Sequence, residues 1–369
     1  MNLFFISILS LLSVNVNKEN ILKEKLLTNY VNDVLPYTNS NTSVKLKLGI
    51  ALRAFNEINQ IDGTITSNIW LRHWWNDPKL VWNKTEWGIS KISLFTDTDI
   101  ERSIWVPDIY LYNTAESPME NLHYSRAIIY SNGNIIWSRP GIITSTCHFD
   151  LEFFPYDQQT CYLKFGSWTY HAAELDLSTK NNDNMDLSNF QKNEGWDILE
   201  TNSQLDETLY QCCPEVYQAI YYNFKLRRKP GFFVLNIIIP TFATATLMIL
   251  SLLIPWDSGE RISFTMTVML SIIVFLLILS ESLPKTNTKP LLSRMLIGLV
   301  FFSLFVVFFT VVISAIHSYT KNNKQFCRKL MVFLNKFKCK RKLTKTCAQM
   351  MFKIDSFLGA LFLIKVMLY

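Results

Sequence analysis

Histidine is scarce in this sequence, and the groups that enzymes use for chemistry are not clustered. The 369 residues include five histidines, which are scattered along the chain. We find no nucleophile–base pair and no phosphate-binding glycine loop, so the sequence supports no enzyme, no catalytic residue and no cofactor. Internal repeats, heptad arrays and the cysteine spacing typical of metal sites are also missing, and no metal site is predicted.

Charge is missing from three long stretches, residues 232–254, 262–279 and 295–316. At 1.5 Å per residue, the first and third can cross a hydrocarbon core of about 30 Å, and the second can do so with its flanking turns. A fourth apolar stretch, residues 349–369, is interrupted by lysine and aspartate. We expect it to be a truncated fourth span. The chain is therefore predicted to cross a lipid bilayer several times.

The segments before and after the predicted spans indicate which parts of the chain lie outside the cell. Residues 1–17 contain an apolar stretch too short to span and are typical of a secretory signal peptide. Its removal would leave residues 18–229 outside, before the three spans within residues 230–319. The short segment 320–348 is rich in lysine and arginine and has no acid. Beside a span, the positive-inside rule assigns such a segment to the cytoplasm, which is favoured over a nucleic-acid or lipid-binding patch.

The outer segment is predicted to be a β-sandwich. Between about Thr64 and Lys229, short alternating or aromatic-rich runs are separated by turns and show no helical periodicity. Asn132-Gly133 between two apolar runs indicates a hairpin. Before this region, only Ile21–Leu35 has a helical pattern.

Disulfides persist outside the cell, where four cysteines allow three pairings. Cys147 and Cys161 enclose thirteen residues with FPYD in the middle. If these two pair and no outer thiol stays free, the adjacent Cys212 and Cys213 must bond to each other. The outer segment also contains glycosylation sequons, at Asn41 and Asn83.

Several motifs, in order, resemble those of the Cys-loop pentameric ligand-gated ion channels. They are the cysteine loop with FPYD, the run KFGSW, the vicinal pair in YQCCPEVY, and DSGERIS at the second span. More narrowly, the chain is similar to an α-type nicotinic acetylcholine receptor subunit. The resemblance implies disulfides Cys147–Cys161 and Cys212–Cys213. It also implies an immunoglobulin-like β-sandwich followed by a four-helix transmembrane bundle, in a pentamer at the postsynaptic plasma membrane with its N-terminus outside.

The expected agonist is acetylcholine or a similar quaternary amine. Its ammonium has charge but no hydrogen-bond donor, whereas the faces of Trp and Tyr attract it by about 0.5–2 kcal/mol each. The resemblance nominates a principal face of Tyr112, Trp168, Tyr210, Cys212, Cys213 and Tyr217. It nominates a complementary face from the adjoining subunit, made of Trp70, Ile128, Ile136 and Ser138. Core packing is the alternative role for these tryptophans.

The second span carries a stripe of small, polar and apolar residues at spacings of three and four. The members are Ser263, Thr267, Leu270, Val274, Ile278 and Glu281. These spacings put them on one helical face, and Glu260 precedes the helix. In a bundle, the stripe would line a pore with carboxylates at both mouths, which favours cations. Leu270 is the candidate gate.

The resemblance also implies a coupling path between agonist site and pore. It assigns this role to Phe154, Pro155, Asp157, Arg228 and Pro284. Where the family's arginine meets an acid, this chain has Gln60, with Glu57 and Asp62 nearby. The salt bridge expected from the family is therefore in doubt.

Other functions stay open at this point. A channel gated by another amine or passing anions is one, although Glu260 argues against anions. A non-conducting subunit or ligand-binding decoy is the other, because the cytoplasmic segment is short. Homologous subunits are the expected partners, in a homo- or heteropentamer, and no nucleic acid is expected.

Overall fold

The computed structural model describes residues 18–37, 43–97, 103–116, 122–180, 184–255, 259–285 and 290–322. The predicted signal peptide, the sequon at Asn41, the end of the cytoplasmic segment and the fourth span lie outside the described residues. The chain divides into two compact units. The first comprises Met1–Asp150 and Gln158–Arg228, and the second comprises Leu151–Asp157 and Lys229–Tyr369.

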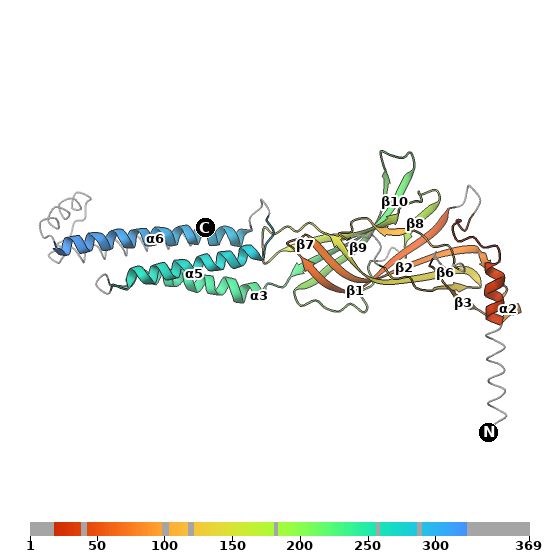
Figure 1. Cartoon of the computed structure of the whole chain (residues 1–369), viewed down its shortest axis with the longest axis horizontal. Helices are drawn as coiled ribbons and strands as arrows, with labels where there is room; N and C mark the ends of the chain where they lie inside the picture. Colours follow the sequence, from red (N-terminus) through yellow and green to blue (C-terminus); the bar gives the residue numbers. More distant parts are fainter. Residues whose placement is uncertain are drawn as a thin grey trace, which may run out of the picture. The chain divides into compact units, whose positions relative to one another are not determined.

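The first unit contains a six-stranded sheet in the order β3-β5-β6-β2-β1-β8 and a four-stranded sheet in the order β4-β7-β10-β9 (Figure 1). Strands β1 and β8 pair in parallel, and the other strand pairs among the described residues are antiparallel. The strands are β1 (Val44–Asn59), β2 (Thr64–Val81), β3 (Lys91–Leu94), β4 (Ile109–Leu111), β5 (Ala127–Tyr130), β6 (Asn132–Thr146), β7 (Gln158–Ser167), β8 (Leu175–Thr179), β9 (Trp196–Leu209) and β10 (Val216–Arg228); the short helix α2 is Lys84–Trp87.

The two sheets enclose an apolar core between them. Buried side chains alternate with half-buried or exposed ones along β2, as period-two strands require. Phe55 of β1 and Phe224 of β10 meet across the core with ring centroids 5.5 Å apart. The predicted hairpin lies between β5 and β6, where Gly133 has a φ of 80°. A Cβ there would come within 2.5 Å of the Asp77 carbonyl oxygen, so glycine is required at this turn.

Two expectations about the start of the unit were wrong. The helix covers residues 18–27 and does not reach Leu35. It ends because Asn29 takes the left-handed conformation, with φ 61°, and the Tyr30 hydroxyl donates to Asp77 at 2.7 Å. The sheet begins with β1, before the predicted start at Thr64. In β1, Lys45 and Lys47 alternate with buried aliphatic residues, and this signal was overlooked.

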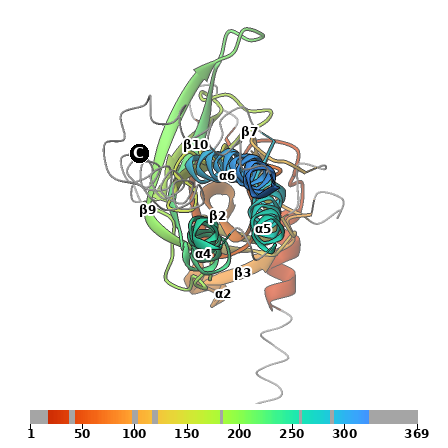
Figure 2. The same ribbon diagram turned by 90° about the vertical axis from the view of Figure 1, so that its left-hand side faces the viewer.

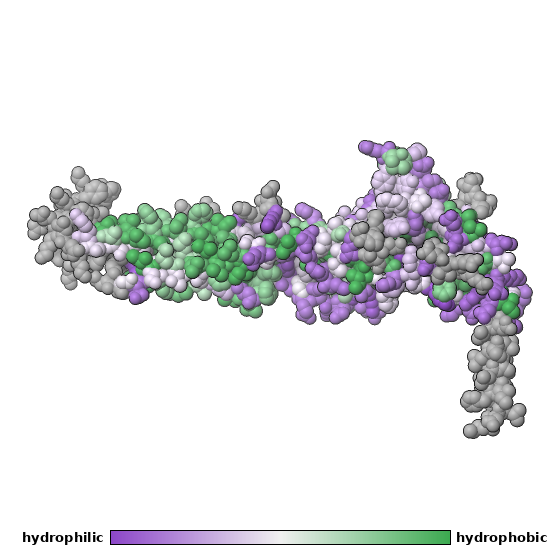
Figure 3. Space-filling model, in the orientation of Figure 1, coloured by the Kyte–Doolittle hydropathy of each residue, from purple (hydrophilic) through white to green (hydrophobic). Residues whose placement is uncertain are grey.

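The second unit contains three helical segments that are long and apolar enough to cross a membrane, Gly231–Leu253, Arg261–Glu281 and Leu291–Ile316. They lie close to the predicted spans and pack side by side (Figure 2). Their exposed surface is largely apolar, as a lipid environment requires (Figure 3). The elements are α3 (Gly231–Phe233), the π-helix η2 (Val234–Ile238), α4 (Ile239–Leu250), the 3-10 helix η3 (Ser251–Leu253), α5 (Arg261–Glu281) and α6 (Leu291–Asn322).

A small buried cluster holds these helices together. It consists of Met248 of α4, Val268 and Ile272 of α5, and Val306 of α6. Since each helix contributes to the cluster, the side of α5 that carries Val268 and Ile272 packs against α4 and α6. Its opposite side is left exposed, and that is where the predicted pore residues lie.

Candidate functional site

The predicted principal residues gather at one end of the four-stranded sheet. Tyr112 directly follows β4, and its ring meets Trp168 edge-on, with centroids 6.2 Å apart and planes at 88°. Tyr210 and Tyr217 flank the β9–β10 turn and also meet edge-on, at 5.8 Å. The backbone N–H of Ala172, in the segment after Trp168, donates to Val216 at the start of β10. Strand pairing thus brings the hairpin base to the segment that carries Trp168.

Local bonds hold the Trp168 segment in place. Asp108 accepts from the Ser167 hydroxyl at 2.6 Å and from the Thr169 N–H at 2.7 Å, on either side of Trp168. The Tyr112 hydroxyl donates to the Ser167 carbonyl oxygen. A Cβ at Gly166 would lie 2.9 Å from the Tyr112 ring, so glycine permits this close approach. The indole of Trp168 itself is 63% exposed and is available to a ligand.

The surroundings of Tyr112 keep this tyrosine neutral. Burial raises the pKa of Tyr112 to about 12, and Tyr210, Asp108 and Tyr217 add to the shift. The influence of Tyr210 and Tyr217 on this pKa means that both lie near Tyr112. A tyrosine that stays protonated presents an electron-rich ring face without a full charge, which suits a cation that cannot hydrogen-bond.

A lysine that the sequence reading missed lies beside this group. The ammonium of Lys164 is 4.6 Å from the Tyr221 ring centroid, 5.8 Å from that of Tyr112 and 3.4 Å from an Asp206 oxygen. Burial lowers its pKa, but the hydrogen bond to Tyr221 and the nearby Tyr210 and Asp206 outweigh burial, so the pKa is raised. Lys164 belongs to the quoted KFGSW motif, and its alternation with Phe165 along β7 was the available signal.

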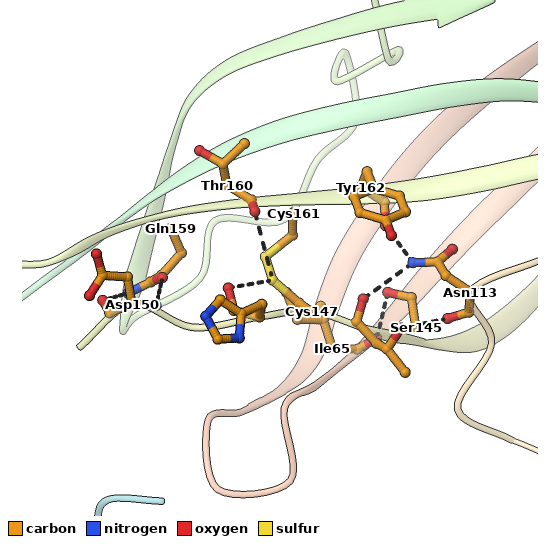
Figure 4. The surroundings of a disulfide bond; sticks show 11 residues. Ile65, Asn113, Ser145, Cys147, Asp150, Gln159, Thr160, Cys161 and Tyr162 are labelled. Atoms are coloured by element: carbon orange, nitrogen blue, oxygen red, sulfur yellow. Dashed lines mark hydrogen bonds between the residues drawn. A yellow bond between two sulfur atoms is a disulfide. The ribbon is translucent and has the colours of Figure 1, made fainter. Parts of the chain in front are cut away.

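Both predicted disulfides are present. Cys212 and Cys213 are bonded to each other at the hairpin tip, where the Cys213 N–H donates to the Tyr210 carbonyl oxygen at 3.2 Å. Cys147 and Cys161 are bonded with their Cα atoms 5.4 Å apart (Figure 4). This second bond closes the loop whose middle, Leu151–Asp157, belongs to the other unit.

The predicted complementary residues share one face of the six-stranded sheet. Ile128 pairs with Ile136, and Ser138 pairs with Arg72, two residues from Trp70 along β2. Trp70 is 37% exposed, and the Arg53 guanidinium carbon lies 4.5 Å from the centroid of its ring. Within one chain, the principal residues therefore lie at the four-stranded sheet and the complementary residues lie on the six-stranded sheet. Sequence reading missed Arg53, which reaches Trp70 only through β1–β2 pairing.

The predicted pore residues are all exposed on α5 or at its ends. Leu270 is 61% exposed, and the other exposed members are Glu260, Ser263, Thr267, Val274, Ile278 and Glu281. At 3.6 residues per turn, this stripe lies roughly opposite the buried Thr265, Val268, Ile272 and Leu279. Arg261 is only 3% exposed and donates to the Ile254 carbonyl oxygen at 3.4 Å. Its charge is therefore on the packed side, away from the stripe.

The predicted coupling residues divide between the two units. In the first, Arg228 donates to the Gln60 amide oxygen at 2.6 Å and lies 4.1 Å from the Trp196 ring centroid. In the second, Phe154 is buried against Phe233 of α3, with centroids 4.6 Å apart.

The cysteine-loop segment also reaches the start of α6 within the second unit. The backbone carbonyl oxygen of Glu152 accepts from the Leu291 N–H at 2.9 Å, and the Glu152 carboxylate lies 3.9 Å from the Arg294 guanidinium. The Phe154–Pro155 peptide bond is cis, and Asp157 is buried. Pro284 follows α5 and is half-buried, and residues 286–289 of the expected contact region lie outside the described residues. Among the described residues, the cysteine-loop segment therefore contacts residues that follow this linker, Leu291 and Arg294.

The predicted glycosylation site at Asn83 is at the N-terminus of α2. Its side-chain oxygen accepts from the Thr85 N–H at 3.0 Å and from the Thr85 hydroxyl at 2.7 Å. The residue is exposed, so an acceptor here would be reachable.

Comparison with known proteins agrees with this architecture. Residues 19–230 match the neurotransmitter-gated ion-channel ligand binding domain, and residues 237–353 match the neurotransmitter-gated ion-channel transmembrane region. The chain belongs to the neurotransmitter-gated ion-channel family. Within this family it is similar to acetylcholine receptor alpha subunits, and it carries a bonded pair of adjacent cysteines. Since the family consists of channels, the prediction that the chain is not an enzyme is confirmed.

Three relatives give the extent of the similarity. The acetylcholine receptor subunit alpha-like 2 of Drosophila melanogaster is 36% identical over 330 residues, covering 87% of this chain and 56% of the relative. The acetylcholine receptor subunit alpha-L1 of Schistocerca gregaria is 36% identical, covering 79% and 53%. The human neuronal acetylcholine receptor subunit alpha-6 is 35% identical, covering 81% and 60%. The chain thus spans little more than half the length of these members of the family.

Proposed function

We propose that this chain is a subunit of an acetylcholine-gated, cation-selective ion channel in the plasma membrane. It would assemble with homologous subunits into a homo- or heteropentamer. The observation that carries the proposal is the aromatic group, in which the exposed indole of Trp168 meets Tyr112 and the disulfide-tipped hairpin supplies Tyr210 and Tyr217. Such a group suits a quaternary ammonium, whose charge is spread over methyl groups that contact ring faces.

The agonist would lie between the principal residues of one subunit and Trp70, Ile128, Ile136 and Ser138 of the next. Closure of the hairpin over the ammonium would exclude water and strengthen its attraction to the rings. Movement at the hairpin base would then reach the second unit through the strand that ends at Arg228 and through the closed cysteine loop. Phe154, Pro155, Asp157 and Pro284 are the proposed contacts in that transfer.

The pore would be lined by the exposed stripe of α5. Rings of Glu260 and Glu281 would concentrate cations at the two mouths, and Ser263 and Thr267 would offer hydroxyls to partly dehydrated ions. Leu270 and Val274 would form apolar constrictions that block ions by dewetting when they are narrow. The buried position of Arg261 supports cation selectivity, because its charge would not offset that of Glu260.

The test is to express this chain alone in a voltage-clamped cell and measure the reversal potential of currents evoked by acetylcholine. We expect a reversal that follows the sodium and potassium gradients, and loss of the current in Trp168→Ala while surface labelling is unchanged. A reversal that follows chloride would overturn the selectivity derived from Glu260. If the chain reaches the surface but stays silent, co-expression with related subunits decides the matter. The proposal is supported if co-expression restores a current that depends on Trp168. It is overturned if co-expression gives no acetylcholine-evoked current.

A further inference from the structure

A hollow of the first unit lies on the six-stranded sheet. Strands β1, β2 and β6, the end of β5 and the helix α2 enclose about 630 Å³, a size typical of small-molecule sites. Of the ten predicted agonist residues, the described lining includes only Ile136. The hollow is therefore a separate feature, and the inference below does not rest on the proposed agonist.

Positive charge dominates this hollow. Its described lining contains Lys45, Lys47 and Lys84 and no Asp or Glu. Among the described residues, none of the three ammonium groups forms a salt bridge. Lys45 and Lys47 lie on the same face of β1, about 7 Å apart along the strand at about 3.3 Å per residue. They are thus spaced to hold two anionic groups of one molecule.

The amides that line the hollow are largely bonded among themselves. The Asn76 amide donates to the Asn134 side-chain oxygen at 2.9 Å and to the Asn132 carbonyl oxygen at 3.1 Å. The Asn132 side-chain oxygen accepts from the Asn134 N–H. These bonds fix one end of the hollow, whereas the three lysines of its described lining form no salt bridge with the described residues.

An apolar wall lies beside the lysines. Trp74 pairs with Lys47 on one side and with Ile136 on the other, and its indole lies against β1 at Gly49. A Cβ at Gly49 would come within 3.0 Å of that ring, so the glycine permits this packing. The Lys180 ammonium lies 4.2 Å from the centroid of the Trp74 ring and packs against it. Tyr130 adds a second aromatic side chain to the lining.

We propose that this hollow binds a small organic dianion with a flat apolar body. The lysines would hold the two anionic groups as hydrated point charges, which suits carboxylate, phosphate or sulfate. Trp74, Tyr130 and Ile136 would bury the body of the molecule. An anion without such a body would be attracted by the lysines but would make no apolar contact. A monoanion would contact only some of the three lysines.

Titration calorimetry on the purified full chain in detergent tests this with three probes. Isophthalate has two carboxylates on a ring, benzoate has one, and inorganic phosphate has charge without a ring. We expect isophthalate to bind saturably and at least about tenfold more tightly than either of the other two. Lys45→Gln/Lys47→Gln should weaken isophthalate at least about tenfold, and Lys84→Gln or Trp74→Ala less.

The matched control is Lys192→Gln/Lys225→Gln, which removes the same charge from the same unit outside the hollow, and it should bind as the unchanged chain does. Thermal melts of every variant confirm folding. If the double variant unfolds, Lys84→Gln is the variant that tests the role of the lysines. Absence of saturable isophthalate binding overturns the proposal. So does equal binding of phosphate, or an equal loss in the control variant, because either result means general attraction to a basic surface.

Discussion

The two predicted halves of the agonist site expose their tryptophans in different ways. Trp168, on the four-stranded sheet, is 63% exposed, and its ring plane lies at 88° to that of Tyr112. Trp70, on the six-stranded sheet, is 37% exposed and already has the Arg53 guanidinium 4.5 Å from its ring centroid. A resident cation uses the same ring attraction that a quaternary ammonium would use. We infer that Trp168 supplies more agonist affinity than Trp70.

The largest effect is expected at Trp168. Trp168→Ala removes a desolvated cation–π contact of about 2 kcal/mol and should weaken acetylcholine about 30-fold. The acetylcholine affinity of Trp168→Phe, which keeps a smaller ring, should lie between that of Trp168→Ala and that of the unchanged chain. Competition binding on surface-expressed protein measures both. Equal affinity of Trp168→Ala and the unchanged chain would show that the ammonium binds elsewhere.

A smaller loss is expected from Gly166→Ala, which disturbs the same half indirectly. The new methyl group would press on the Tyr112 ring at 2.9 Å and on the Gln218 carbonyl oxygen at 3.1 Å. Overpacking of this kind costs about 1–3 kcal/mol, so acetylcholine affinity should fall about tenfold. Gly195→Ala is the control, since its methyl group meets the nearest side chain at an ordinary 3.5 Å. A similar loss in both variants would contradict the role of Tyr112.

The complementary half should respond weakly and with opposite signs. Trp70→Ala should weaken acetylcholine binding about threefold. Arg53→Gln should strengthen acetylcholine binding about twofold, because it frees the Trp70 ring for a cation–π contact worth about 0.5 kcal/mol at an exposed site. In the Trp70→Ala background, Arg53→Gln should have no effect. A double-mutant cycle by competition binding measures this coupling. If Arg53→Gln strengthens binding equally without Trp70, the effect is long-range charge, and the inferred competition is wrong.

The smallest effect is expected from pH. The pKa values of Tyr112 and Lys164 are raised, so both groups keep their protons up to pH 9. Burial lowers the pKa of His73 to about 3, so it stays neutral above pH 7 and destabilises the fold only as the pH falls below about 6.5. Acetylcholine affinity should therefore change less than about twofold between pH 7 and 9 in binding assays. A steep change there would mean that another group titrates in the site.

Much of the fold followed from local sequence patterns. Charge-free runs predicted the three described spans, and Asn132-Gly133 predicted the β5–β6 hairpin, because both signals depend on neighbouring residues. The N-terminal helix and β1 were misjudged at their limits. Asn29 and the long-range bond from Tyr30 to Asp77 end the helix, and a pattern of helix formers does not report such a bond.

The sequence by itself determined the family, the order of the units, both disulfide pairings through family resemblance, and the stripe along α5. Only the tertiary structure decided that Arg53 lies over Trp70, that Gly166 accommodates Tyr112, that Arg261 is on the packed side of its helix, and that three lysines meet at one hollow. The physical reason is the range of the interactions. Helix periodicity and turn preferences act over a few residues, whereas these contacts depend on strand register and helix packing between segments far apart in the chain.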